Sequence, residues 1–459
     1  MDIITKLITK KTKGSIMIFS LVFGSVAFTI IISGLAGYAL FQHKSTAINS
    51  VRDRAFHIAE AGAEYYRWHL AHYPTDYKDG TDTPGPYIHE YKDKDDNVIG
   101  YFSLEITPPV SGTAVMTVKS SGWVVEAPTA KRTVQITMAR PALTDYSLLN
   151  NSNINFGFTS VTHGPVHSNG GIRFDGTSDT WVESAKETYQ YLNQTHTGVW
   201  GGGGPKSFWK YPVPAVDFNG ITLDLANLQA SAEAEGIYLT SSGEQGWHLT
   251  LKADRTVDVY KVKTLKCYNG NGKYKNGVWQ GTVVCVDIGT EEFFANYPIP
   301  ASGSIFAEDN VWVQGVVNGH ISIGAGQFPS SPANYRTIYI NNNITYLEKV
   351  AGNSIGLLTE GDIVIPHDVP NDMVIEGALL SQYGKMTRPY YINNTRNSLT
   401  MYGSSISFET SGVKYTNGWG TVISGFVNTL YTYDANLRYF PPPFFPVKNV
   451  YELLSWREL

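Results

Sequence analysis

The sequence has few cysteines, little charge and no early proline, and each shortage narrows what the chain can be. Cys267 and Cys285 are its two cysteines, and they lack the nearby histidine pairs that a zinc site would need. Charged residues make up 16% of the chain and the formal net charge is −5, so no basic face indicates a nucleic-acid binder. The first proline is Pro74, which leaves the amino-terminal part free to form one uninterrupted helix.

The residues that are abundant indicate a β-rich extracellular protein. Glycine (44), tyrosine (29) and tryptophan (10) are frequent, a mixture typical of short strands joined by many turns. Cys267 and Cys285 bracket a turn-rich stretch that can fold back on itself, so a disulfide is predicted if the domain lies outside the cytoplasm. The alternative is two unpaired thiols. No cofactor and no metal site are expected.

A long apolar run from Ser15 to Phe41 contains no charged residue, and Lys6, Lys10, Lys11 and Lys13 precede it. As a helix this run would be about 40 Å long, more than the roughly 30 Å hydrocarbon core of a bilayer. The lysines predict that its amino-terminal end stays in the cytoplasm. An ordinary secretion signal has a shorter core, whereas a plain signal anchor fits as well.

The helical pattern continues beyond Phe41, but it becomes amphipathic. Apolar residues recur at helical spacing from Ile48 to Tyr66, with charged residues largely between them. Together the two halves predict one helix from Ser15 to about Tyr73. A simple anchor needs no such extension, whereas a subunit that packs its apolar half among copies of itself would use one.

Two motifs carry a family resemblance: "KGSIMIF", which opens the apolar run, and "RDRAFHIAEAGAEYY" at 52–66. They resemble the start of type IV pilin-like proteins, most closely the large PilX-type minor pilins and minor pseudopilins. The resemblance implies a leader over residues 1–14, cut between Gly14 and Ser15 by a prepilin peptidase, and methylation of Ser15 as the new amino terminus. It also implies other pilins and the pilus assembly machinery as partners, and membrane lipid around residues 15–41 before assembly.

The chain departs from the major pilins at Phe19, the fifth mature position, where they carry a glutamate. In that family the glutamate neutralises the free amino terminus of a neighbouring subunit inside the apolar fibre, where an unpaired ammonium is costly. The tip of a filament is the one place without such a neighbour. Phe19 therefore favours a tip-type subunit, and the alternative is that it marks only low abundance.

Residues 74–140 read as a small antiparallel sheet on the second half of the helix. A loop-forming stretch at 74–86 is followed by alternating segments at 87–92, 98–107, 114–125 and 132–139, with turn residues between them. This arrangement is that of a pilin-like domain. The predicted class is α+β, with domains at 1–14, 15–73, 74–140 and 141–459.

Residues 141–459 are predicted to form a large β-rich head. Short apolar stretches alternate with Gly, Asn and Asp turns, which favours a right-handed β-helix or solenoid, with a β-sandwich as the alternative. One short helix is expected, with Asp224 as its amino-terminal cap and Gly236 as its end.

The predicted function is a minor, tip-type subunit of a type IV pilus-like filament that carries the head to the cell surface for adhesion or filament initiation. Trp200, Trp209, Trp279 and Trp419 lie in or beside Gly-rich loops and are the candidate ligand-facing aromatics, for a surface glycan or another cell-surface ligand.

Two alternatives remain: a signal-anchored β-helix enzyme acting on carbohydrate, and an anchored surface protein that never polymerises. An enzyme of the first kind would need paired carboxylates, and no spacing singles out a pair. The candidates are Glu308, Asp309, Glu360, Asp362, Asp368, Asp372 and Glu376. The sequence also has no G-x-S-x-G motif and no phosphate loop, so catalysis is not expected.

Overall fold

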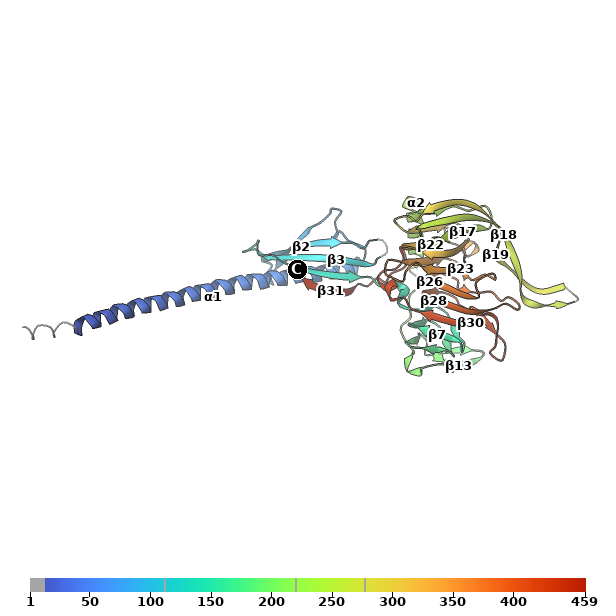
Figure 1. Cartoon of the computed structure of the whole chain (residues 1–459), viewed down its shortest axis with the longest axis horizontal. Coiled ribbons are helices and arrows are strands. Elements are labelled where there is room, and N and C mark those ends of the chain that lie inside the picture. The colour runs from blue at the N-terminus through green and yellow to red at the C-terminus, as the bar shows by residue number, and fades with distance from the viewer. Residues whose placement is uncertain (1–12, 111–112, 219–220, 276–277) are drawn as a thin grey trace, which may run out of the picture. The chain divides into compact units, whose positions relative to one another are not determined.

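The computed structural model describes residues 13–110, 113–218, 221–275 and 278–459 (Figure 1). The chain divides into two compact units. The helix unit comprises Met1–Thr107, Thr117–Thr137 and Ser455–Leu459, and the head unit comprises Pro108–Met116 and Met138–Leu454.

The helix unit is built on α1 (Lys13–His72), a single helix of 60 residues. The prediction of one helix that continues beyond Phe41 is confirmed. The helix is unbroken because no proline interrupts it and both halves have helical periodicity. The segment Ile16–His72 is long and apolar enough to cross a membrane, with a mean hydropathy of 2.4 in its most apolar window. The apolar side chains of its first half are exposed, whereas those on one face of its second half are buried.

A sheet covers that buried face. Its order is β1 (Tyr87–Lys92), β2 (Val98–Thr107), β3 (Val115–Val124), β4 (Arg132–Ala139) and β31 (Glu452–Glu458). The pairs β1–β2 and β2–β3 are antiparallel. β1 to β4 lie where the alternation of apolar and polar residues predicts them. The fifth strand, β31, was not predicted, because it comes from the far end of the chain. Their inward side chains meet those of α1 in one core: Ala55, Ile58, Ala59, Ala63, Tyr66 and Leu70 from the helix, with Phe102, Leu104, Val118 and Val124 from the sheet.

Two glycines let the helix and the sheet approach closely. A Cβ atom at Gly122 would lie 2.4 Å from the Ala55 carbonyl oxygen and 2.4 Å from the Ala59 nitrogen, both in the backbone of α1. A Cβ atom at Gly62 would lie 2.6 Å from the Phe102 ring. Real side chains do not approach so closely, so both positions require glycine for packing.

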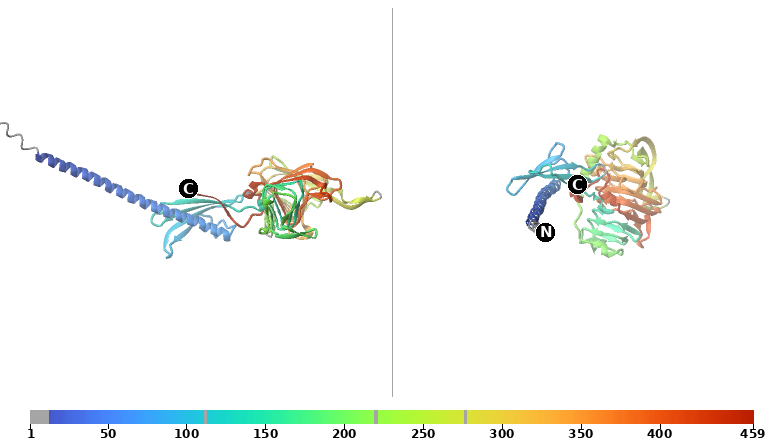
Figure 2. Two further views of the ribbon diagram at one scale, coloured as in Figure 1. Left: turned by 90° about the horizontal axis from the view of Figure 1, so that it is seen from below. Right: turned by 60° about the vertical axis from the view of Figure 1, so that its left-hand side comes forward.

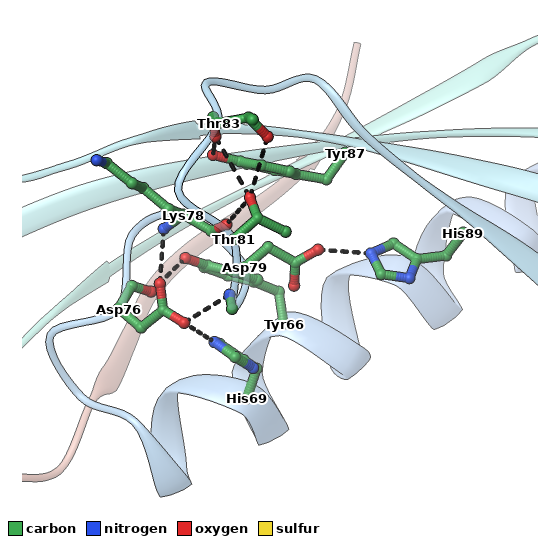
Figure 3. A network of polar contacts seen from close by, with 10 residues as sticks. Tyr66, His69, Asp76, Lys78, Asp79, Thr81, Thr83, Tyr87 and His89 are labelled. Carbon is green, nitrogen blue, oxygen red and sulfur yellow. Dashed lines mark hydrogen bonds and ion pairs between the residues drawn. The ribbon is translucent and has the colours of Figure 1, made fainter.

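The loop after α1 is held to the helix by polar contacts (Figure 3). The carboxylate of Asp76 accepts hydrogen bonds from the N–H groups of Lys78 (2.8 Å) and Gly80 (2.6 Å), and it lies 2.8 Å from Nε2 of His69. Asp79 lies 2.6 Å from Nε2 of His89 on β1. The loop is therefore anchored to the end of α1 and to the sheet.

The head unit contains a stack of parallel strands. In spatial order it runs β16 (Ile237–Leu239), β20 (Ser304–Ala307), β22 (His320–Ala325), β24 (Ser354–Thr359), β26 (Asp372–Ser381), β28 (Thr395–Ser407), β5 (Leu148–Asn150), β8 (Val166–Ser168), β11 (Val182–Ser184) and β15 (Trp209–Lys210). Strands β5 to β15, which come first in the chain, continue the stack beyond β28.

Further parallel ladders flank this stack. One runs β17 (Gly246–Leu251), β21 (Val311–Val317), β23 (Ile338–Tyr346), β25 (Ile363–Val364) and β27 (Met386–Thr387). Another joins β28 to β30 (Val422–Thr432), β7 (Ser160–His163) and β10 (Thr177–Ser178), and a third is β6 (Ile154–Phe156), β9 (Ile172–Phe174) and β14 (Val199–Trp200). Their aliphatic side chains fill the interior between the ladders.

Smaller elements complete the head unit. β12 (Thr188–Tyr191) and β13 (Gln194–Thr197) form a hairpin, and β29 (Lys414–Thr416) pairs with β30 in antiparallel fashion. Helix α2 (Ile221–Glu235) packs Leu228 and Ala232 near Phe306. The predicted helix is present, but Asp224 is not its cap because α2 begins earlier, at Ile221. Short 3-10 turns lie at Leu143–Asp145, Lys206–Phe208, Pro332–Asn334 and Ala435–Arg438.

One long hairpin, β18 (Thr256–Lys275) with β19 (Val278–Pro298), extends past the stacked strands in both Figure 1 and Figure 2. Cys267 and Cys285 are register partners on this hairpin and form a disulfide, with a Cα–Cα distance of 4.0 Å. The disulfide therefore ties the two strands together within the hairpin.

Candidate functional site

The first half of α1 presents apolar side chains in every direction. Phe19 is 75% exposed, and its neighbours along Ile16–Phe41 are exposed in the same way. Within the described residues no strand or loop covers this stretch. The backbone of Gly14 and Ser15 lies at the start of α1, while the side chain of Ser15 and residues 1–12 lie outside the described part of the chain.

The four candidate tryptophans fall in three places. Trp200 and Trp209 line one open pocket of about 420 Å³ near β13, here called the tryptophan pocket. Trp419 is 93% exposed at the tip of a turn before β30. Trp279 lies on the long β18–β19 hairpin, where its indole N–H donates to the Thr282 carbonyl at 3.1 Å. The structure brings Trp200 and Trp209 together in one pocket, while Trp279 and Trp419 do not line it.

Trp200 is held rigidly in the wall of the tryptophan pocket. Its ring stacks on His196 at a centroid distance of 3.6 Å, and its Nε1–H donates to the Tyr189 hydroxyl at 2.8 Å. The Arg173 guanidinium lies 5.5 Å from the Trp200 ring and 5.8 Å from the Tyr191 ring. These contacts fix the orientation of Trp200 and leave it a packed residue rather than a free stacking platform.

A second pocket, of about 500 Å³, adjoins these groups and is here called the lysine pocket. Its lining includes Phe156, Phe158, Arg173, Asp175, Tyr191 and Lys414. Since Arg173 lines this pocket and also contacts Trp200, the two pockets share a wall. Phe158 is 71% exposed, which is unusual for a phenylalanine in a head with so large a core.

Lys414 is the unusual group of the lysine pocket. Its Nζ donates to the hydroxyl oxygens of Thr159 (3.0 Å), Ser160 (3.2 Å) and Thr429 (3.5 Å). Among the described residues it forms no ion pair with a carboxylate, and burial lowers its pKa to about 8. A half-buried ammonium surrounded by neutral hydroxyls favours the binding of a negatively charged ligand.

Arg173 and Asp175 form a fixed pair beside Lys414. Nε of Arg173 donates to Oδ2 of Asp175 at 2.9 Å, and Nη1 reaches the Tyr191 hydroxyl at 3.4 Å. Oδ1 of Asp175 accepts from the Gly202 N–H at 2.8 Å. Asp175 thus orients the guanidinium and partly neutralises it.

Sequence reasoning missed Lys414, Arg173 and Phe158. Each comes from a different part of the chain. Pairing between strands distant in sequence brings them together: β30 with β7 and β6 with β9 in parallel, and β29 with β30 in antiparallel fashion. The one available signal was a lysine in an alternating strand segment, "VKYT", where its side chain is half-buried.

The acidic residues considered for carbohydrate cleavage serve as hydrogen-bond acceptors in the fold. Glu376 accepts from the Tyr346 N–H at 2.6 Å and pairs with Lys349 at 2.9 Å. Asp309 accepts from the Ser242 N–H at 3.0 Å. These bonds tie neighbouring segments of the head to one another.

No protein-family model and no curated protein matches this chain. Among solved structures it is similar to the competence-associated pilin ComZ from Thermus thermophilus, at 14% sequence identity and a TM-score of 0.31. The similarity covers 89% of this chain and 97% of that one.

Proposed function

We propose that this chain is a minor subunit of a type IV pilus-like filament. It is anchored by residues 15–41 before assembly and displays its head for adhesion or filament initiation. The observation that carries the proposal is α1 itself, one continuous helix whose first half is apolar and exposed and whose second half packs on its own sheet. Such a rod can leave lipid and pack among similar rods while its folded domain travels with it.

Processing of the leader tests this proposal directly. The full chain is produced together with a prepilin peptidase, and the intact mass of the protein is measured in both the membrane and the soluble fractions. We expect a mature chain that begins at methylated Ser15. An uncut Met1 would indicate a plain anchor, and a start near Phe41 would indicate ordinary secretion. Gly14→Val should block the cut, whereas the matched change Gly24→Val, within α1, should leave it intact.

The tip-type role is part of the proposal and depends on Phe19. An apolar side chain at the fifth mature position offers no charge to the amino terminus of another subunit, and an unpaired buried ammonium is costly. Phe19→Glu should therefore raise the number of copies per filament, as counted by immunogold labelling along filaments. An unchanged copy number would mean that Phe19 does not define the position.

We propose that the head is a β-solenoid. The expected limits of 74–140 for the sheet and 141–459 for the head need one change at the carboxyl end, because β31 belongs to the sheet and Ser455–Leu459 to the helix unit. The strands within each ladder pair in parallel. This supports a solenoid over a β-sandwich, whose strands pair mainly in antiparallel fashion. The proposal includes no catalytic step. A head of this kind provides a long, rigid surface on which a ligand site can be carried away from the cell.

A further inference from the structure

We propose that the lysine pocket binds a carboxylate-bearing sugar unit of a surface glycan. The acid group would lie at Lys414 and Arg173, and the sugar ring against Phe158 and Tyr191. This inference rests on the proposed function, because a displayed head gives such a site access to other surfaces, and it names the ligand class and the residues.

The cationic part of the site is built by Lys414. Its ammonium already has three hydroxyl acceptors, which fix its position but bring no opposite charge. Burial without a counter-charge disfavours the ammonium, and burial is also what lowers its pKa to about 8. A ligand carboxylate supplies the missing charge by taking the N–H that now donates to Thr159, the one of the three hydroxyl partners that lines this pocket. The exchange is favourable because a charge-assisted hydrogen bond is stronger than the neutral one it replaces.

Gly157 keeps Lys414 accessible. A Cβ atom built at Gly157 would lie 3.6 Å from Cε and 3.8 Å from Nζ of Lys414, which are ordinary contact distances. A larger side chain at this position would therefore cover the ammonium without forcing the backbone apart. Gly157 lines the same pocket, so it offers a way to close the site while Lys414 stays in place.

The apolar part of the site is formed by aromatic rings at its edge. Phe158 is exposed and lines the pocket, together with Tyr191 from the β12–β13 hairpin. Gly420 and Thr421 of the Trp419 turn line it from another side, and that turn is fixed because Asn417 accepts from the N–H groups of Trp419 and Thr421 at 3.0 Å each. Rings that are apolar on their faces, beside a few placed polar groups, suit a sugar.

Charge favours an acidic sugar over a nucleic acid. The pocket has two cations, Lys414 and Arg173, and Asp175 already pairs with the second. Nucleic-acid binding depends on many phosphate contacts from a basic surface, and this chain has a net charge of −5. A volume of about 500 Å³ is within the range of small-ligand pockets.

The test is calorimetric titration of the full chain in detergent micelles with a galacturonic acid trimer. The probe is compared with its methyl ester, which removes the charge and keeps the ring. We expect the acid to bind at least about tenfold more tightly than the ester, since a charge-assisted hydrogen bond supplies that difference. Equal binding of acid and ester, or no binding of either, would overturn the proposal.

Three variants localise the effect. Lys414→Met and Gly157→Leu should each weaken binding of the acid by about tenfold or more. Lys385→Met is the matched control, because that lysine lies in the same head and already pairs with Glu409 at 3.0 Å. The affinity of this variant for the acid should stay unchanged. A loss in Lys385→Met equal to that in Lys414→Met would place the site elsewhere and overturn the assignment.

Two further measurements keep the result interpretable. The melting temperature of each variant is recorded, and Gly157→Leu replaces Lys414→Met as the deciding variant if the latter unfolds. A single-stranded oligonucleotide that binds more tightly than the trimer, and competes with it, would overturn the choice of ligand. None of these readouts depends on leader cleavage or filaments, so their failure is distinct from failure of the pilin-like assignment.

Discussion

Ile30 and Ile58 lie on the same helix, yet the first is 66% exposed and the second 2% exposed. The second half of α1 is amphipathic, and its apolar face is covered by β2 and β3 of the same chain. The first half is apolar all round, and no part of the described chain covers it. A side chain buried within the chain contributes to folding, whereas an exposed apolar helix of this length needs a partner outside the chain.

The largest test of this comparison places one charge on each half of α1. Positions 30 and 48 both carry isoleucine, and the two side chains are similarly exposed, Ile30 at 66% and Ile48 at 58%. Ile30→Arg should cost about 3 kcal/mol of membrane insertion, because an arginine near the centre of a span is unfavourable. Ile48→Arg lies beyond the apolar run and should cost far less. The measurement is the fraction of full chain that resists carbonate extraction from membranes. Equal loss from both variants would break the comparison.

The next test adds one methyl group at a glycine that packs against α1, Gly122, and at a glycine of α1 with no near neighbour, Gly34. Gly122→Ala places a Cβ atom against the backbone of α1, with contacts of 2.4 Å, and should destabilise the helix unit by about 1–3 kcal/mol through overpacking. Gly34→Ala meets nothing within 4 Å and should leave that unit as stable as before. Hydrogen exchange of residues 87–139 reports the difference. Unchanged protection in Gly122→Ala would mean that helix and sheet do not pack as described.

The helix unit was largely predictable from sequence because local patterns determine it. The absence of proline before Pro74 and the change from all-apolar to amphipathic spacing place the ends and the two halves of α1. Alternation separated by turn residues places β1 to β4. The glycine contacts were not predictable, since Gly122 is recognisable only once α1 lies against it.

The head was less predictable because its order in space differs from its order in sequence. β28 pairs with β5, so residues near 400 continue into residues near 150. No local pattern encodes such a junction. The lysine pocket depends on a second junction of this kind, β30 with β7, since Lys414 on β29 reaches Ser160 on β7 and Thr429 on β30. Trp200, chosen from its Gly-rich loop, lies beside Arg173 of that pocket, but the sequence did not single out Arg173 or Lys414.

A smaller effect is expected at the loop that follows α1. Burial raises the pKa of Asp76, but hydrogen bonds from Lys78, Gly80 and His69 outweigh it, so the pKa lies below its ordinary value of 3.8. The ionised carboxylate therefore stabilises the loop at any pH above 3.8, the ordinary pKa of an aspartate. This contribution is lost as the pH falls from 3.8 towards the lower pKa of the folded state.

Asp76→Asn should remove about 1 kcal/mol of local stability at neutral pH, and proteolysis within residues 73–86 should speed up accordingly. In the wild type the same acceleration should appear only below about pH 4. The exposed Asp82 of the same loop provides the control Asp82→Asn, for which no change is expected. Equal acceleration in both variants would mean that the loop is not held by Asp76.

The smallest effect is expected at the ion pair between helix and sheet. Arg54 and Glu126 are 3.4 Å apart, with side chains 45% and 63% exposed. Exposed pairs contribute little because water and salt screen them, so Glu126→Gln should leave the melting temperature unchanged within error. Glu64→Gln, whose partner Arg67 lies on the same helix, is the matched control. Glu126→Gln could instead destabilise the helix unit as much as Gly122→Ala does, with the difference from the wild type disappearing at high salt. That result would mean that charge rather than apolar packing holds the second half of α1. The contrast between its two halves would then no longer identify which of them needs an external partner.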